Sequence, residues 1–200
     1  MCSLILLCSL LLCISPNLAL LTSSSILHNS SSLHLCHEHE SSALLNFVKP
    51  FTIIDDPYVW KEGTDCCEWE GITCHSLNHH VISLDLSFSG IKGTIESNSS
   101  LFLLRHLEYL DLSSNALQGP LPMKILNLPH LKHLDFGYND GLFSDSPLSN
   151  WSSPLEFLAL SKVNLSTSLP SSPAQQHLRE LDLSYCSIHG SIPTWVWNTS

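Results

Sequence analysis

Apolar residues recur along residues 81–193 with a spacing that predicts a series of short strands. Five segments share the pattern apolar-x-x-Leu-x-(Leu/Phe): VISLDL from 81, LEYLDL from 107, LKHLDF from 131, LEFLAL from 155 and LRELDL from 178. Because side chains alternate along a strand, the last two apolar residues of each segment point to the same side. A single such segment cannot bury its own apolar face, so stacked repeats with a parallel sheet and a continuous core are expected.

The third position after each strand is expected to stabilise the turn. It holds Ser89, Asn115, Asn139, Val163 and Cys186 in successive repeats. An asparagine there would turn its amide inward and satisfy loop backbone groups that stacking buries. Val163 cannot do so, which predicts a looser turn or another donor. Cys186 is expected to be a reduced, buried thiol.

The second half of each repeat identifies the subtype. A hydrophobe, a glycine and an apolar-Pro pair follow the turn in the second repeat (Leu117, Gly119, Leu121-Pro122) and again in the fifth. This ending resembles the plant-specific class of leucine-rich repeats. The resemblance implies an α/β repeat solenoid, a right-handed superhelix with a second short strand at this ending. The third repeat needs one extra residue after Asn139, and the fourth has Thr167 in the glycine position, so both are expected to be less regular.

The cysteines cluster ahead of the repeats. Of eight, three precede residue 14, four lie at Cys36, Cys66, Cys67 and Cys74, and Cys186 stands alone. In an oxidising compartment the four indicate two disulfides, with three possible connectivities. Nearby histidines raise the alternative of a zinc site, but no C-x2-C pair exists, and we expect no metal and no cofactor. The histidine-rich stretches are interpreted as solvated loops.

Residues 36–80 resemble the plant N-terminal cap of leucine-rich-repeat proteins. Residues 39–49 predict a short helix that begins at Ser41 or Ser42 and ends at Pro50. The stretch VWKEGTDCCEWEGITC then resembles the family signature, carried by Trp60, Cys66, Cys67, Trp69, Gly71, Ile72 and Cys74. The family implies the pairs Cys36–Cys66 and Cys67–Cys74. The predicted organisation is therefore a disulfide-stapled cap at 36–80, followed by about five repeats over 81–200.

The N-terminus predicts the compartment. Residues 1–25 contain an apolar run that suits a cleaved signal peptide, with cleavage at about 19–25, although no basic residue precedes it. The alternative is an uncleaved anchor or a buried helix. No second apolar stretch of this chain is long enough for a transmembrane segment. We expect a secreted protein of the apoplast, or one at the cell membrane if the full-length protein carries a C-terminal transmembrane helix.

Composition and sequons agree with a secretory route. The formal net charge of −10 excludes the basic face that a nucleic-acid binder needs. Five N-x-(S/T) sequons offer glycosylation sites at Asn29, Asn98, Asn150, Asn164 and Asn198.

The signal, the cap, NSSLFLLRHLEYLDLSSN (98–115) and the repeat endings together resemble the N-terminal part of a plant receptor-like protein of the disease-resistance type. Such proteins continue into more repeats and a transmembrane helix, so the chain is interpreted as truncated. The resemblance implies extracellular recognition of a protein, peptide or glycan ligand in defence, a membrane co-receptor kinase as partner, and no catalysis. The alternatives are a secreted inhibitor of microbial cell-wall enzymes, similar to polygalacturonase-inhibiting proteins, or a non-functional fragment.

Ligand recognition is expected on strand residues that face away from the core and form the concave surface. One column carries Phe88, Ser114, Tyr138, Lys162 and Tyr185; the other carries Ser83, Tyr109, His133, Phe157 and Glu180. The candidate ligand-binding residues are Phe88, Tyr109, His133, Tyr138, Phe157, Lys162 and Tyr185, because exposed aromatic residues are typical anchors. The alternative is that these rings pack on neighbouring strands. A further column, Asp85, Asp111, Asp135 and Asp182, is interpreted as solvated or bonded to neighbouring strands rather than as a cation site.

Overall fold

The computed structural model describes residues 36–53, 60–144, 148, 152–165, 177–191 and 193–194. The chain divides into two compact units, Met1–Ser31 and Ser32–Ser200, and every described residue belongs to the second. The expected signal segment and the sequons at Asn29, Asn150 and Asn198 lie outside the described residues, as does Thr167. In the described part of the chain, none of the helices has the length and hydropathy needed to span a bilayer.

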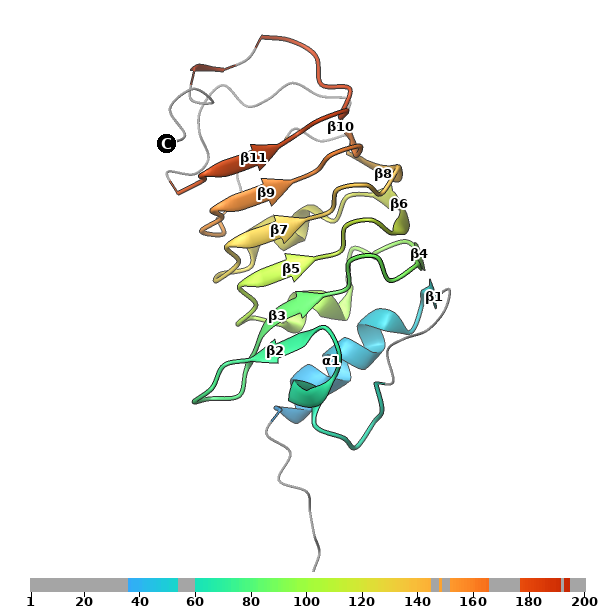
Figure 1. Ribbon diagram of the computed structural model, residues 1–200, viewed down its shortest axis with the longest axis vertical. Coiled ribbons are helices and arrows are strands. Elements are labelled where there is room, and N and C mark those ends of the chain that lie inside the picture. Colours follow the sequence, from blue (N-terminus) through green and yellow to red (C-terminus); the bar gives the residue numbers. More distant parts are fainter. Residues whose placement is uncertain are drawn as a thin grey trace, which may run out of the picture. The chain divides into compact units, whose positions relative to one another are not determined.

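The predicted strands form one sheet. It comprises β2 (Ile72–Cys74), β3 (Val81–Asp85), β5 (Tyr109–Asp111), β7 (His133–Asp135), β9 (Phe157–Ala159) and β11 (Glu180–Asp182), in the order β11-β9-β7-β5-β3-β2 (Figure 1). The strands from β3 to β11 are parallel and in register, whereas β2 of the cap is antiparallel to β3. Each repeat therefore contributes one strand at the predicted position, which confirms the solenoid.

A second sheet forms where each repeat ends. It contains β1 (Thr52–Ile53), β4 (Ile91–Gly93), β6 (Ala116–Pro120), β8 (Gly141–Ser144) and β10 (Asn164–Leu165), ordered β1-β4-β6-β8-β10. Short 3-10 helices, η2 (Ser100–Leu103) and η3 (Met123–Asn127), follow β4 and β6. The third and fourth repeats keep this strand, so their departures from the pattern do not interrupt the sheet. Leu142 reaches the core beyond the extra residue, and its N–H donates to the Asn139 carbonyl.

The strand leucines make the core continuous from one repeat to the next. Leu84, Leu110, Leu134 and Leu158 are at most 1% exposed. Each buried leucine contributes about 1.5–3 kcal/mol relative to an exposed one. Leu181 in β11 is only partly buried, although it still packs against the core.

The asparagine position ties successive repeats together. The Asn139 Oδ1 accepts a hydrogen bond from the Leu117 N–H at 3.0 Å, and its Nδ2 donates to the Leu112 and Phe136 carbonyls at 2.9 and 3.0 Å. In the fifth repeat the free, buried Cys186 thiol takes over the donor role, with its Sγ 2.8 Å from the Leu160 oxygen. Burial raises the pKa of this thiol to about 11, so it stays protonated and able to donate.

The cap consists of α1 (Glu38–Val48), η1 (Cys66–Glu68) and strands β1 and β2. The expected helix start is wrong: α1 begins three residues earlier than Ser41, with His37 at the N-cap and no side-chain capping bond. The Ser41 hydroxyl instead donates to the Glu38 carbonyl inside the helix. The early start brings Glu40 into the helix, and its carboxylate is buried against the first repeat.

Two disulfides staple the cap, and they join Cys36 to Cys66 and Cys67 to Cys74, the pairs that the family resemblance implies. The second bridge lies beside Trp69, which is 6% exposed and stacks on Trp60 with ring centroids 5.3 Å apart. The Trp69 Nε1 donates to the Thr64 hydroxyl at 2.8 Å. These contacts order a region whose own apolar core is small.

Candidate ligand-binding surface

The outer face of the six-stranded sheet carries a continuous row of rings. We call Ser83, Tyr109, His133, Phe157 and Glu180 the strand column, because backbone pairing places them side by side in register. The rings of Tyr109, His133 and Phe157 stack with both centroid distances at 4.1 Å and interplanar angles of 14° and 4°. One ring per repeat thus fills the spacing between strands, as the packing alternative predicted for these three residues.

Stacking covers both faces of the His133 ring and one face each of Tyr109 and Phe157. The Tyr109 hydroxyl donates to the Asp111 carboxylate at 3.3 Å, and burial together with that negative charge raises the tyrosine pKa to about 12. His133 lies between two rings, where burial lowers its pKa below the ordinary 6.5. Its buried Nε2 has no hydrogen-bond partner among the described residues. The centre of the column is therefore a neutral, apolar strip.

The aspartate column shapes turns. Asp85, Asp111, Asp135 and Asp182 each accept the backbone N–H two residues further along. Asp182 also accepts a hydrogen bond from the Ser161 hydroxyl of the preceding repeat. Within the described residues, it is the one aspartate of the four that bonds to a side chain of a neighbouring repeat. Burial raises the pKa of Asp135 to about 6. Each carboxylate is thus engaged within its own turn; Asp85 and Asp182 are also exposed to solvent, and Asp182 bonds to the neighbouring repeat as well.

A column of alternating charge runs beside the rings, and sequence reasoning did not single it out. Lys132 pairs with Glu108 at 2.6 Å, and Arg179 pairs with Glu156 at 3.6 Å. The signal was the alternation of acidic and basic residues that precede the strand-column positions from Tyr109 to Glu180. Because both pairs are partly exposed, each contributes little to stability, but together they neutralise this strip.

The other predicted column does not lie on strands. Phe88, Ser114, Tyr138, Lys162 and Tyr185, here called the turn column, follow the strands and all have positive φ, from 53° to 66°. In the first four of them the N–H donates to a carbonyl of the next repeat, as from Phe88 to Ser113 at 3.1 Å and from Tyr138 to Ser161 at 2.7 Å. The rings at the two ends are the most accessible: Phe88 is 81% and Tyr185 is 82% exposed.

Lys162 and Tyr138 interact within the turn column. The Lys162 Nζ lies 5.1 Å from the centre of the Tyr138 ring and 4.0 Å from Asp140. A groove of about 440 Å³ opens beside them, next to the second sheet. It is lined by Lys92, Asn115, Ala116, Leu117, Gln118, Tyr138, Asp140, Gly141 and Lys162. This groove therefore offers two lysines, one aspartate and one aromatic wall.

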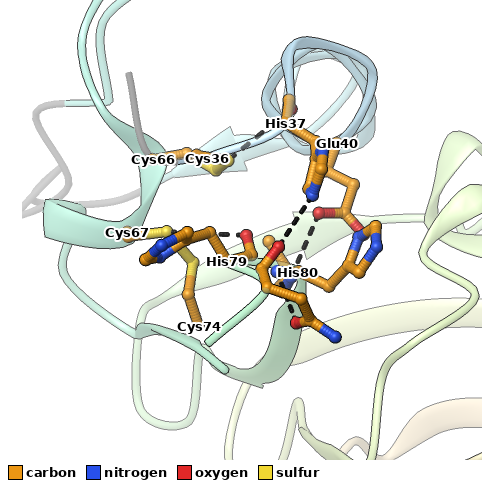
Figure 2. A network of polar contacts seen from close by, with 10 residues as sticks. Cys36, His37, Glu40, Cys66, Cys67, Cys74, His79 and His80 are labelled. Carbon is orange, nitrogen blue, oxygen red and sulfur yellow. Dashed lines mark hydrogen bonds and ion pairs between the residues drawn. A yellow bond between two sulfur atoms is a disulfide. The ribbon is translucent and has the colours of Figure 1, made fainter. Parts of the chain in front are cut away.

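Histidines form a fourth column where the strands begin. The interpretation as solvated loop is therefore wrong for the stacked His37 and His80, whereas His75 and His79 lie in the loop between β2 and β3. The ring of His80 stacks on His37 at 4.0 Å and on His106 at 3.7 Å, and His130 continues the row at 5.9 Å. Glu40, 1% exposed, accepts the Val81 N–H at 3.1 Å and lies 3.2 Å from the His80 Nδ1 (Figure 2). Burial and neighbouring histidines lower the pKa of His106. The recurrence of His ahead of the strand leucine was the signal available in the sequence.

Metal binding at the cap cysteines has a structural obstacle. The sulfurs of Cys36, Cys66 and Cys74 lie within 4.8 Å of one another. All three are in disulfides, and a disulfide sulfur lacks the thiolate that binds metal.

The chain matches known leucine-rich-repeat families. The family described as leucine rich repeat N-terminal domain matches residues 37–75, and leucine-rich-repeat families match 106–128, 127–142 and 177–199. Together with the two sheets, these matches show that the chain is a leucine-rich-repeat protein with the plant-type cap.

Individual plant receptor-like proteins and a receptor ectodomain resemble this chain. Receptor-like protein 7 of Arabidopsis thaliana is 36% identical in an alignment of 184 positions that covers 80% of this chain and 18% of that protein. Receptor-like protein Cf-9 of Solanum pimpinellifolium is 32% identical over 84% of this chain and 25% of its own length. The Arabidopsis receptor kinase HAESA ectodomain, solved with an N-terminally extended IDA peptide hormone, has a TM-score of 0.65 at 26% identity, over 80% of this chain and 27% of that one.

These similarities confirm the resemblance to plant receptor-like proteins. The chain spans about a fifth to a quarter of the length of the receptor-like proteins compared here.

Proposed function

We propose that this chain is the N-terminal, ligand-recognising part of the extracellular domain of a plant receptor-like protein that acts in defence. The similarity to Cf-9 and Receptor-like protein 7 supports the receptor class. The carboxylates of the sheet stabilise turns, and the rings either pack against one another or are exposed to solvent. This surface therefore supports ligand recognition. The ligand is a peptide, protein or glycan in the apoplast, and signalling requires a membrane co-receptor kinase.

One observation carries the proposal. Five repeats hold their backbone in register, while the turn column carries Phe, Ser, Tyr, Lys and Tyr in successive repeats. A rigid ladder with variable side chains can be adapted to one partner without change to its core. The solved HAESA ectodomain, of the same architecture, is in complex with a peptide hormone.

The test uses the complete receptor that contains this chain, expressed in leaves with its co-receptor. Alanine at both Tyr138 and Tyr185 should reduce the response to apoplastic fluid from infected tissue, with normal receptor abundance. Leu103→Ala is the matched control, because Leu103 is also exposed, at 58%, but lies in η2. An unchanged response in the double variant would assign recognition to another surface. Inhibition of a purified polygalacturonase by the secreted chain would favour the inhibitor class.

A further inference from the structure

The strand column and the turn column differ in how completely rings fill the spacing between repeats. In the strand column Tyr109, His133 and Phe157 stack at 4.1 Å, so one ring per repeat closes the column. In the turn column Phe88 and Tyr138 come from the first and third repeats, and the second repeat places the small Ser114 between them. The turn column therefore has an open position the width of one ring.

The backbone holds this open position in register. The N–H of Phe88 donates to Ser113 at 3.1 Å, and the N–H of Ser114 donates to Gly137 at 2.8 Å. With strands about 4.8 Å apart, the two aromatic positions are about 9.6 Å apart. A ring midway would lie about 4.8 Å from each, which is within the range for stacked aromatic pairs.

Stability does not explain why rings occupy these turns. Phe88 and Tyr138 have φ of 53° and 57°, a conformation that glycine or asparagine adopts at lower cost. Their side chains are 81% and 52% exposed, so burial returns little for that strain. Strained backbone that carries exposed rings is characteristic of functional positions.

The groove beside the open position adds polar recognition. Tyr138 and Asn115 form part of its wall, and Lys92 of β4 also lines it. Lys162 is engaged with Asp140 and Tyr138, whereas Lys92 has no ion pair within the described ranges. The groove can therefore accept a chain that leads away from the ring position and carries a negative charge.

We propose that Phe88 and Tyr138 form an aromatic clamp that binds one aromatic side chain of an extended peptide at Ser114, with an acidic residue of that peptide near Lys92. This inference rests on the proposed function, since it specifies the ligand of a recognition domain. The peptide ring completes the stack that the strand column already shows in its filled form.

Two variants test the clamp from opposite directions. Phe88→Asn/Tyr138→Asn removes both walls and places a residue that tolerates positive φ at each turn. Ser114→Tyr fills the open position from within the protein. Leu103→Asn removes an exposed apolar side chain elsewhere and serves as the control. The secreted chain is used to select binders from a random-peptide phage library, and the selected peptides are then measured against each variant.

We expect selected peptides with an aromatic residue close to Asp or Glu. Both clamp variants should weaken their binding by about tenfold or more, while Leu103→Asn leaves it unchanged. The double asparagine variant should unfold at the same or a higher temperature than the parent chain, because it relieves strain. A lower midpoint would show that the rings are structural and overturn the clamp.

Binding that survives both clamp variants would also overturn it, but would leave recognition of peptides intact. Failure to select any peptide would count against peptide recognition itself, and the clamp would fall with it.

Discussion

At the residue scale, buried asparagine amides connect one repeat to the next. Asn139 is fully buried; it satisfies the Leu117 N–H and shares the Leu112 carbonyl with the Asn115 amide. Cys186 replaces only the donor half of this role, and Val163 neither half. The repeats therefore tolerate a turn without the asparagine side chain, although that turn then lacks some of the hydrogen bonds between repeats.

Asn139→Ala should lower the free energy of unfolding by about 2–3 kcal/mol, since it leaves a buried donor and acceptor unpaired. Urea unfolding followed by circular dichroism measures the change. Gln118→Ala removes an exposed amide from β6 and should cost less than about 0.5 kcal/mol. Equal costs for both variants would contradict the assigned role of Asn139.

At the scale of elements, α1 is joined to the first repeats by the histidine column. The titratable groups that surround His106 are His37, His39, Glu40, His80 and His130. Burial and the adjacent imidazoles lower the His106 pKa, while Glu40 opposes them. The unfolded chain then takes up its proton at a higher pH than the folded chain. The contribution to stability is complete above about pH 6.5 and is lost as the pH falls through the lowered folded value.

Wild type should therefore lose stability relative to His106→Gln when the pH is lowered from 7.5 to 5. Asp135 acts in the opposite direction, because its pKa is raised from 3.8 to about 6 and protonation favours the folded chain. Comparison of the two proteins at each pH cancels that contribution. His177→Gln, at the equivalent exposed position of the fifth repeat, should show no pH-dependent difference. The same pH dependence of stability in both variants would show that the effect does not arise from the histidine column.

The two disulfides should contribute unequally to the cap. Cys36–Cys66 closes a span of 30 residues and Cys67–Cys74 a span of 7. The loop-entropy relation gives about 3.5 and about 2.5 kcal/mol, respectively. Paired serine substitutions, followed by thermal unfolding, should therefore lower the midpoint more for Cys36/Cys66. A reversed order would mean that the short bridge, beside Trp69, acts chiefly through native packing.

At the scale of the whole molecule, the disulfides and the proposed extracellular role require passage through the secretory pathway. Asn98 and Asn164 are both exposed sequon asparagines among the described residues. Chain secreted from plant cells should lose mass on treatment with an N-glycosidase active on plant glycans. Asn98→Gln and Asn164→Gln should each remove one glycan. Secreted protein of unchanged mass would refute glycosylation at both sites.

The repeat architecture follows from the amino-acid sequence alone, because leucine spacing acts locally and recurs five times. Strand positions, the cap and the cysteine cluster follow from it, and similarity to a known cap supplied the pairing. The tertiary structure decided what the intervening residues do. Phe88 and Tyr138 resemble strand positions in sequence, but inter-repeat hydrogen bonds hold them in left-handed turns.

The positions of the histidines and of the stacked rings likewise depend on tertiary packing. The local sequence does not indicate that His37 of the cap stacks with His80 and His106. That contact exists only when α1 packs across the first repeats. Tyr109, His133 and Phe157 could have been exposed anchors or mutual neighbours. The choice depends on the distance between stacked repeats, which is a property of the assembled coil and not of any single segment.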